Sequence, residues 1–292
     1  MPSETSRVVP TAAAARVPPH VFFIVSAIFH YLGPAFAVLL FAQVPPLGVA
    51  WLRNATAAGI FALWRKPWRQ WRTFDQALRR DVLALGAVIA LMNAAFYLAI
   101  DRLPLSTVAV IEFLGPIGVA AAGMRTPRNF CALAVAGAGV YLLTDLRIED
   151  EALGFVLAFI NCGLFTLYIV LSHRIARQGG ASGIDRLGIA LLIAMLVGAP
   201  IGIADAASAL LDPVLIAAGI GVGICSTVIP YVCDQLAMAR LSRGTFALLL
   251  SLLPATATLI GMLILRQVPS LAELMGITLV MIGVAAHREI KA

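Results

Sequence analysis

The amino-acid sequence predicts an all-α membrane protein of ten transmembrane helices, arranged as two inverted five-helix repeats with both termini in the cytoplasm. Three observations lead to this prediction: the composition, a succession of apolar segments, and an internal duplication. Of the 292 residues, 61% are hydrophobic and 12% are charged, and the mean hydropathy is +0.95. Soluble domains carry about twice this charged fraction. A water-soluble core could not bury so much apolar surface, so we expect a membrane protein.

Ten segments are long and apolar enough to cross a bilayer, which takes about 20 residues of α-helix. They are residues 20–42, 46–64, 82–100, 104–124, 129–145, 152–172, 185–203, 213–237, 244–265 and 270–287. Short connections join them, as antiparallel neighbouring helices require. The first segment is about as long as a full span and comes after a polar stretch, so we do not expect a cleaved signal peptide.

The basic residues of the connections indicate the orientation, because cytoplasmic loops carry an excess of Lys and Arg. With the amino terminus inside, the inner connections collect most of these residues, including the cluster Arg65–Arg80. The outer connections hold three: Arg102, Arg147 and Arg266. The cluster contains Trp68 and Trp71, which is typical of an anchor in the lipid interface; binding of anionic head groups is the alternative. Its partner is therefore the lipid bilayer, and we expect no nucleic acid.

The segment Leu98–Met124 recurs as Leu236–Met262, with ten identities over 27 positions at an offset of 138 residues. A composition rich in Leu and Ala would give roughly two or three by chance, so the chain is internally duplicated. Each half holds five helices, and an odd number inverts the second copy, as in many secondary transporters. The expected boundaries are a cytoplasmic tail 1–19, a first repeat 20–145, an external linker 146–151, a second repeat 152–287 and a cytoplasmic tail 288–292.

Two charged residues are expected deep in the membrane, where each costs about 2.5–3.5 kcal/mol on the insertion scale. Arg53 lies eight residues after Pro45, at the start of the second span, and Glu112 lies eight residues after Pro104, at the start of the fourth. Both are therefore roughly 12 Å deep. Equal depth permits an Arg53–Glu112 ion pair that holds two helices together. Alternatively, Glu112 faces a cavity and binds a substrate ammonium group or carries a coupling proton.

Polar residues of the second half concentrate on the eighth span. Thr227, Pro230, Tyr231 and Asp234 fall on one helical face by their spacing. Pro230 frees a backbone carbonyl near residue 226, which is tolerated in a membrane where it faces protein or water. We therefore expect a kinked helix that lines a cavity. Asp234 lies near the cytoplasmic end and is either a functional acid, a solvated residue or a partner of Arg240.

Other polar residues leave two interpretations open. His30 is either a hydrogen-bonded packing residue or a proton relay. Asn93 and Tyr97 either join helices or bind a ligand. The prolines are candidates for kinks that open and close the two sides of the transporter: Pro116, Pro254 and Pro230.

Several activities find no support in the sequence. The four cysteines lack the spacing of a metal site, and no clustered metal ligands or ATP-binding motif occur. No Ser or Cys nucleophile has an evident His partner. We therefore expect no enzyme, no metal and no cofactor, and transport would be driven by a gradient or by exchange.

Two sequence stretches carry a family resemblance. Residues 110–120, VIEFLGPIGVA, and the pattern STVIPY…D…AxxRLxxGTF across residues 226–246 resemble the EamA-type drug/metabolite transporter superfamily. Within it the chain is similar to inner-membrane threonine/homoserine exporters. The resemblance implies a ten-helix fold with a central cavity and proton-linked efflux of amino acids or similar metabolites.

The resemblance also implies roles for individual residues. Arg53 matches a family arginine, Glu112 a family glutamate and Asp234 an acidic position of the eighth helix. Two family glutamates of the ninth helix are replaced by Leu253 and Gln267. The resemblance therefore leaves the coupling route and the substrate open.

Together these observations predict a multi-pass protein of the bacterial inner membrane that exports amino acids of the threonine/homoserine kind, or similar small metabolites, by alternating access. Proton coupling is one route. The expected substrate contacts are Glu112, Asn93, Tyr97, Thr227 and Tyr231. The candidates for coupling or ion pairing are Glu112, Arg53, Asp234 and His30. The alternatives are uptake or facilitated transport of another metabolite or drug, and a membrane sensor or assembly subunit. The oligomeric state stays open and includes a monomer.

Overall fold

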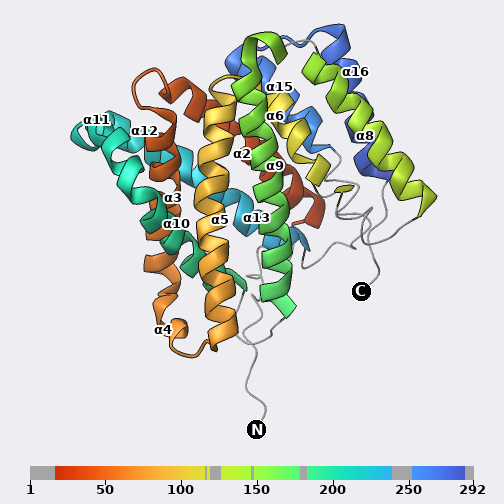
Figure 1. Ribbon diagram of the computed structural model, residues 1–292. Helices are drawn as coiled ribbons and strands as arrows, with labels where there is room; N and C mark the ends of the chain where they lie inside the picture. The colour runs from red at the N-terminus through yellow and green to blue at the C-terminus, as the bar shows by residue number, and fades with distance from the viewer. Residues whose placement is uncertain are drawn as a thin grey trace.

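The computed structural model describes residues 17–115, 117–118, 126–145, 148–177, 183–238 and 252–286, and all regular structure in these ranges is helical (Figure 1). The helices are α2 (Pro19–Leu40), α3 (Pro46–Arg65), α4 (Trp68–Trp71), α5 (Gln76–Ile100), α6 (Leu105–Glu112), α8 (Pro127–Asp145), α9 (Ile148–Arg177), α10 (Gly183–Asp205), α11 (Ala207–Leu211), α12 (Pro213–Gly223), the π-helical segment η1 (Ile224–Val228), α13 (Ile229–Met238), α15 (Leu253–Leu265) and α16 (Leu271–Ala286).

Five helical stretches are long and apolar enough to cross a membrane. They are Pro19–Leu40, Gln76–Ile100, Glu151–Ser172, Asp185–Asp205 and Pro213–Asp234. Shorter apolar helices cover Pro127–Leu143, Leu253–Leu265 and Leu271–Ala286. Each stretch lies on a span expected from the sequence. An all-helical fold with several apolar helices is therefore confirmed for the described residues.

Local sequence signals explain where several helices begin. Pro19, Pro46 and Pro213 occupy first-turn positions, where the missing N–H of proline leaves no donor unsatisfied. The span expected at 82–100 begins earlier, at Gln76. Asp75 explains this difference, because its Oδ1 accepts the Leu78 N–H at 2.7 Å and caps a polar first turn that hydropathy alone does not include.

Other boundaries also differ from the expected spans. The eighth span is interrupted by η1, and the short helices α4 and α11 were not expected. The fourth span is described as α6 up to Glu112, and the ninth from Leu253 onward in α15. Pro116, Arg240 and much of the duplicated motif lie outside the described residues.

Helices from the two halves of the chain pack against each other. Close pairs are α3 with α10, α5 with α9, α8 with α16, and α2 with α13 (Figure 1). Glycines permit some of these approaches. A Cβ added at Gly139 of α8 would lie 2.5 Å from the Gly276 carbonyl oxygen of α16. Small residues at helix interfaces are the usual means of close packing in membranes.

The distribution of side chains is the reverse of that in a soluble protein. Large apolar side chains are exposed along the outside of the bundle; Leu63, for example, is 82% exposed. Charged and amide side chains such as Arg53, Glu112 and Asn161 are buried. Exposed apolar surface on this scale is expected where lipid covers the protein. The polar interior is where the site must be sought.

One end of the bundle is fixed by polar contacts among α3, α4, α5, α9 and α10. Asp185 accepts from Arg65 Nε at 2.8 Å and from Gln70 Nε2 at 2.6 Å. Arg174 pairs with Asp81, at 3.0 Å between Nε and Oδ2. The basic cluster at the end of α3 therefore packs against the first turn of α10.

Candidate substrate site

The centre of the bundle holds a set of buried polar side chains from several helices. All are at most 9% exposed: Ser26 of α2, Arg53 and Asn54 of α3, Asn93 of α5, Glu112 of α6, Asn161 of α9, and Ser226 and Thr227 of η1. Buried polar groups need partners, because an unpaired one carries a large desolvation penalty. Their partners define the site.

Arg53 joins the first half of the chain to η1. Its Nε donates to Thr227 Oγ1 at 2.9 Å, and its Nη2 donates to the Ser226 carbonyl oxygen at 3.2 Å. Pro230, four residues after Ser226, has no N–H to give that carbonyl in an α-helix. The structure thus agrees with the expectation of a freed carbonyl near residue 226, and it identifies Arg53 as the donor that satisfies it.

Tyr97 lies beneath the Arg53 guanidinium. The Arg53 Cζ is 5.6 Å from the centroid of the Tyr97 ring, a distance at which a cation is attracted to the aromatic face. Phe41 contacts the Tyr97 ring edge to face, with centroids 5.8 Å apart. Tyr97 is fully buried. Its ring is therefore a fixed aromatic surface against which the Arg53 guanidinium lies.

Glu112 is the last residue of α6, and it pairs with an amide rather than a cation. Asn161 Nδ2 of α9 donates to Glu112 Oε1 at 3.2 Å. Equal depth permitted a direct ion pair between Arg53 and Glu112, and that prediction is wrong. The two side chains are not within ion-pair distance, because Arg53 directs its donors to η1. Their charges still interact at longer range. An acid and a base thus face the same interior from separate partners.

Asn93 joins two helices of the first half. Its Nδ2 donates to Asn54 Oδ1 at 2.6 Å, and both side chains are buried. One interpretation of Asn93, that it links helices, therefore has a structural basis. Contact with substrate is compatible with this bond, because the Asn93 amide oxygen is a separate acceptor.

The remaining candidates of the second half reach different neighbours. Tyr231 interacts with Tyr168 of α9, and Asp234 interacts with Ser26 of α2. The Ser26 hydroxyl donates to the Pro230 carbonyl at 3.4 Å. The face predicted from spacing thus meets α3, α9 and α2 in succession.

The two remaining candidates are His30 and Pro254. His30 contacts the Tyr31 ring edge to face, with centroids 5.3 Å apart. Pro254 is buried near the start of α15, where its carbonyl accepts from Thr258 Oγ1 at 2.8 Å.

Several buried polar atoms of the interior have no hydrogen-bond partner in the described part of the chain. They are the hydroxyls of Tyr31, Tyr97 and Ser226 and the Oδ1 of Asn161. The predicted site included Tyr97 and left the other three residues out. Asn161 is an isolated amide in an otherwise apolar stretch, and that signal could have selected it.

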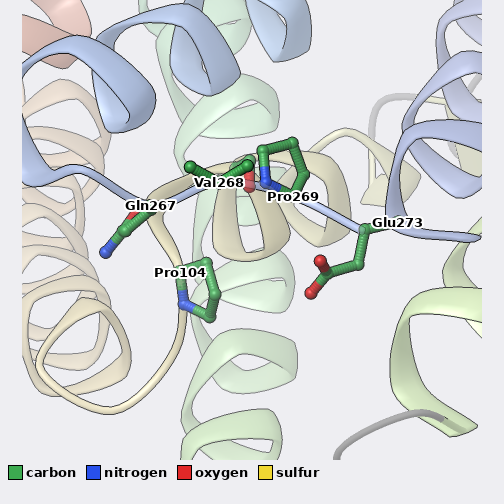
Figure 2. Close-up of a pocket in the computed structure, with 6 residues that line it drawn as sticks. Pro104, Gln267, Val268, Pro269 and Glu273 are labelled. Carbon is green, nitrogen blue, oxygen red and sulfur yellow. The ribbon is translucent and has the colours of Figure 1, made fainter. Parts of the chain in front are cut away.

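A cavity lies where α6 begins, beside the connection from α15 to α16. It has a volume of about 180 Å³ and is lined by Pro104, Ser106, Gln267, Val268, Pro269 and Glu273 (Figure 2). Gln267 Oε1 accepts the Leu105 N–H at 3.1 Å and so caps α6. Glu273 and Ser270 cap the start of α16 reciprocally. Gln267 thus ties the end of α15 to α6.

Comparison with known proteins identifies the family. Residues 152–286 match the EamA-like transporter family. The threonine/homoserine exporter RhtA of Escherichia coli strain K12 is 34% identical over 238 residues, covering 80% of this chain and 79% of the relative. This chain belongs to the EamA-like transporter family. The resemblance expected from the sequence is confirmed, and the EamA-type chain is a multi-pass membrane protein of a family of transporters.

Two further comparisons agree with this assignment of the EamA-type chain. RhtA of Salmonella typhimurium strain LT2 is 32% identical over 235 residues, again 80% of this chain and 79% of the relative. A solved crystal structure superposes with a TM-score of 0.56 at 19% identity, covering 92% of this chain and 97% of that one. At this identity the superposition bears on the fold alone.

Proposed function

We propose that this EamA-type protein exports amino acids of the threonine/homoserine kind from the bacterial cytoplasm across the inner membrane, by alternating access. The observation that carries the proposal is the 34% identity over 80% of the chain to a threonine/homoserine exporter. The interior supports it, because a buried acid, Glu112, and a buried base, Arg53, suit a small zwitterion. Substrate would contact Glu112, Asn93, Tyr97, Thr227 and Tyr231.

The inverted repeat belongs to this proposal, and the helix contacts support it. If the halves are 20–145 and 152–287, α3 and α10 are second helices, α6 and α15 fourth helices, and α8 and α16 fifth helices. Each of these equivalent pairs is in contact. The contact of α5 with α9, third helix with first, has its counterpart in α13 with α2. A pseudo-two-fold relationship between the halves accounts for this pattern.

The orientation is part of the same proposal. Arg65, Arg174 and Arg186 gather at one end of the bundle, where Arg186 donates to the Ile175 carbonyl. Arg102 and Arg266 flank the other end, near the contact of Gln267 with α6. Under the positive-inside rule the first end would be cytoplasmic, and both termini would lie on that side. The cavity of Figure 2 would then open toward the outside.

Proton coupling through Glu112 is the coupling route we propose, with Arg53, Asp234 and His30 as further candidates. Asn161 can donate an N–H to the Glu112 carboxylate or, turned over, accept the proton of the neutral acid. A neutral amide partner thus accommodates both protonation states. Pro230, Pro254 and Pro116 are the proposed kinks that let the halves rearrange.

Export from living cells tests the proposal. In a bacterial strain that lacks its own threonine and homoserine exporters, expression of the wild-type chain should raise the homoserine concentration that stops growth. It should also lower the intracellular homoserine content. An unchanged tolerance, with the protein present in the membrane fraction, would contradict export and favour uptake or a sensor role.

A further inference from the structure

Arg53 is a buried cation whose hydrogen-bond partners are neutral. Its guanidinium contacts the Thr227 hydroxyl, the Ser226 carbonyl and the face of the Tyr97 ring. In the described part of the chain it forms no ion pair with a carboxylate. A buried guanidinium is expensive in a membrane and is normally paired. The arrangement therefore leaves a strong preference for an anion unsatisfied.

Residues that contact Arg53 or Glu112 carry buried polar atoms without partners in the described part of the chain. The Tyr97 hydroxyl belongs to the ring beneath Arg53, and the Ser226 hydroxyl to the residue whose carbonyl accepts from Arg53. The free Oδ1 of Asn161 belongs to the amide that holds Glu112. The side chains of Tyr97, Ser226 and Asn161 are each at most 1% exposed. Such groups retain hydrogen-bonding capacity for a polar ligand.

The partners of the two charges resemble the two ends of an amino acid. Arg53 donates to two oxygen atoms, as it would to a carboxylate. Glu112 accepts from a nitrogen, Asn161 Nδ2, as it would from an ammonium group. The protein thus provides an oxygen pair for Arg53 and an N–H donor for Glu112, the same kinds of atom that a zwitterion would offer.

We propose that Arg53 binds the carboxylate of the substrate, and that Thr227 and Ser226 occupy its donors only when the site is empty. This inference rests on the proposed function and names the chemistry the site selects: a ligand with a free carboxylate beside an amino group. A planar guanidinium suits a carboxylate because it makes two parallel hydrogen bonds. In this inference Thr227 acts through Arg53 as a positioning residue, in place of the direct substrate contact proposed for it above.

Exchange of the Arg53 partners for a carboxylate would also couple substrate binding to a conformational change. Arg53 lies in the first half of the chain and η1 in the second, so a carboxylate that takes the Arg53 donors releases a link between the halves. The released segment is a π-helical turn, a conformation often found at functional sites. It contacts both α2 and α3, and a Cβ added at Gly33 of α2 would lie 2.6 Å from the Ser226 backbone nitrogen.

Competition with modified substrates tests the inference. Uptake of labelled threonine into proteoliposomes preloaded with threonine is measured with one competitor at a time. The competitors are threonine, threoninamide, which lacks the carboxylate, and N-acetylthreonine, which lacks the ammonium. The wild-type protein should prefer threonine to threoninamide at least about tenfold, as expected for a hydrogen-bonded charge pair. Arg53→Gln should abolish this preference and keep the preference over N-acetylthreonine. The matched control Arg174→Gln, at the exposed ion pair, should keep both.

A second variant covers a failure of Arg53→Gln to fold. Thr227→Val keeps the side-chain shape and removes the oxygen that competes for Arg53. It should lower the half-saturating threonine concentration about threefold or more, whereas Thr278→Val on exposed α16 should change nothing. An unchanged or raised value for Thr227→Val, or an intact threoninamide discrimination in Arg53→Gln, would overturn the inference.

Thermal unfolding of the purified protein separates this inference from the proposed function. The probes are butyrate and butyramide, which differ in the carboxylate alone. Stabilisation by butyrate that Arg53→Gln removes, in a protein that moves no amino acid, would reject the proposed function and keep the carboxylate site. Threonine transport without any carboxylate preference would reject the carboxylate site and keep the proposed function. If neither stabilisation by butyrate nor transport of threonine is observed, both the inference and the proposed function are rejected.

Discussion

Glu112 of α6 accepts a hydrogen bond of 3.2 Å from Asn161 of α9, and the amide oxygen of Asn161 has no partner among the described residues. An amide can present either its N–H or its oxygen to a carboxyl group. The pair can therefore hold Glu112 in its charged and its neutral form. This property is what a buried proton carrier needs.

Glu112→Gln removes the titrating group and keeps the size and the hydrogen bonding of the side chain. We predict that threonine transport in this variant loses its response to a pH gradient, because no proton binds at residue 112. The measurement compares uptake into proteoliposomes with and without the gradient. Glu151→Gln, at the start of α9, is the control and should respond like the wild type. An unchanged response in Glu112→Gln would remove Glu112 from the coupling mechanism.

Gly33→Ala should loosen the contact between α2 and η1. The added Cβ would lie 2.6 Å from the Ser226 backbone nitrogen, which cannot move aside like a flexible side chain. We expect a loss of about 1–3 kcal/mol in unfolding free energy, as for other overpacked sites. Gly59→Ala, where nothing lies within 4 Å, is the matched control and should be neutral or stabilising. Thermal unfolding in detergent measures both; equal behaviour would contradict the tight contact.

Asn93→Ala should leave the Asn54 amide oxygen without its donor. Hydrogen bonds between transmembrane helices contribute about 0.6–2 kcal/mol, so the unfolding free energy should fall by that order. The half-saturating threonine concentration of the folded variant then decides the second role of Asn93. A value at least about threefold higher would assign it a substrate contact as well, whereas no loss of stability would contradict the helix-joining role.

The two ion pairs at the predicted cytoplasmic end should differ in strength. Asp185 is 1% exposed and accepts from both Arg65 and Gln70, so Asp185→Asn should lower the unfolding free energy by about 1–3 kcal/mol. Both acids are buried, but the Arg174 side chain is 64% exposed against 31% for Arg65, so Arg174→Gln should cost less than about 1 kcal/mol. Denaturation of both variants under the same conditions measures the difference. An equal loss would refute this ranking.

The sequence located the helices well, because hydropathy reports directly on membrane depth. It also selected Arg53 and Glu112, which are buried in the structure, and predicted the free carbonyl before Pro230. Depth, however, is a single coordinate and does not say which way a side chain points. The π-helical turn of η1 holds an extra residue and rotates the helix after it, so the Thr227 and Ser226 contacts of Arg53 could not be derived from α-helical spacing.

The buried partners of Glu112 and Asn93 were unpredictable for a related reason. Asn161 and Asn54 are distant in the sequence from the residues they bind, and only the packing of α6 on α9 and of α3 on α5 brings them together. The early start of α5 depended instead on one capping carboxylate, Asp75, which lies outside the apolar segment.

Counterflow in proteoliposomes tests the central claim most directly. Vesicles are preloaded with unlabelled threonine, homoserine or another amino acid, and entry of the matching label is measured with and without a pH gradient. Our account predicts transient accumulation of label with threonine or homoserine and a response to the gradient. No accumulation with any amino acid, by a correctly folded protein, would contradict amino-acid transport and leave the family and the helical fold in place.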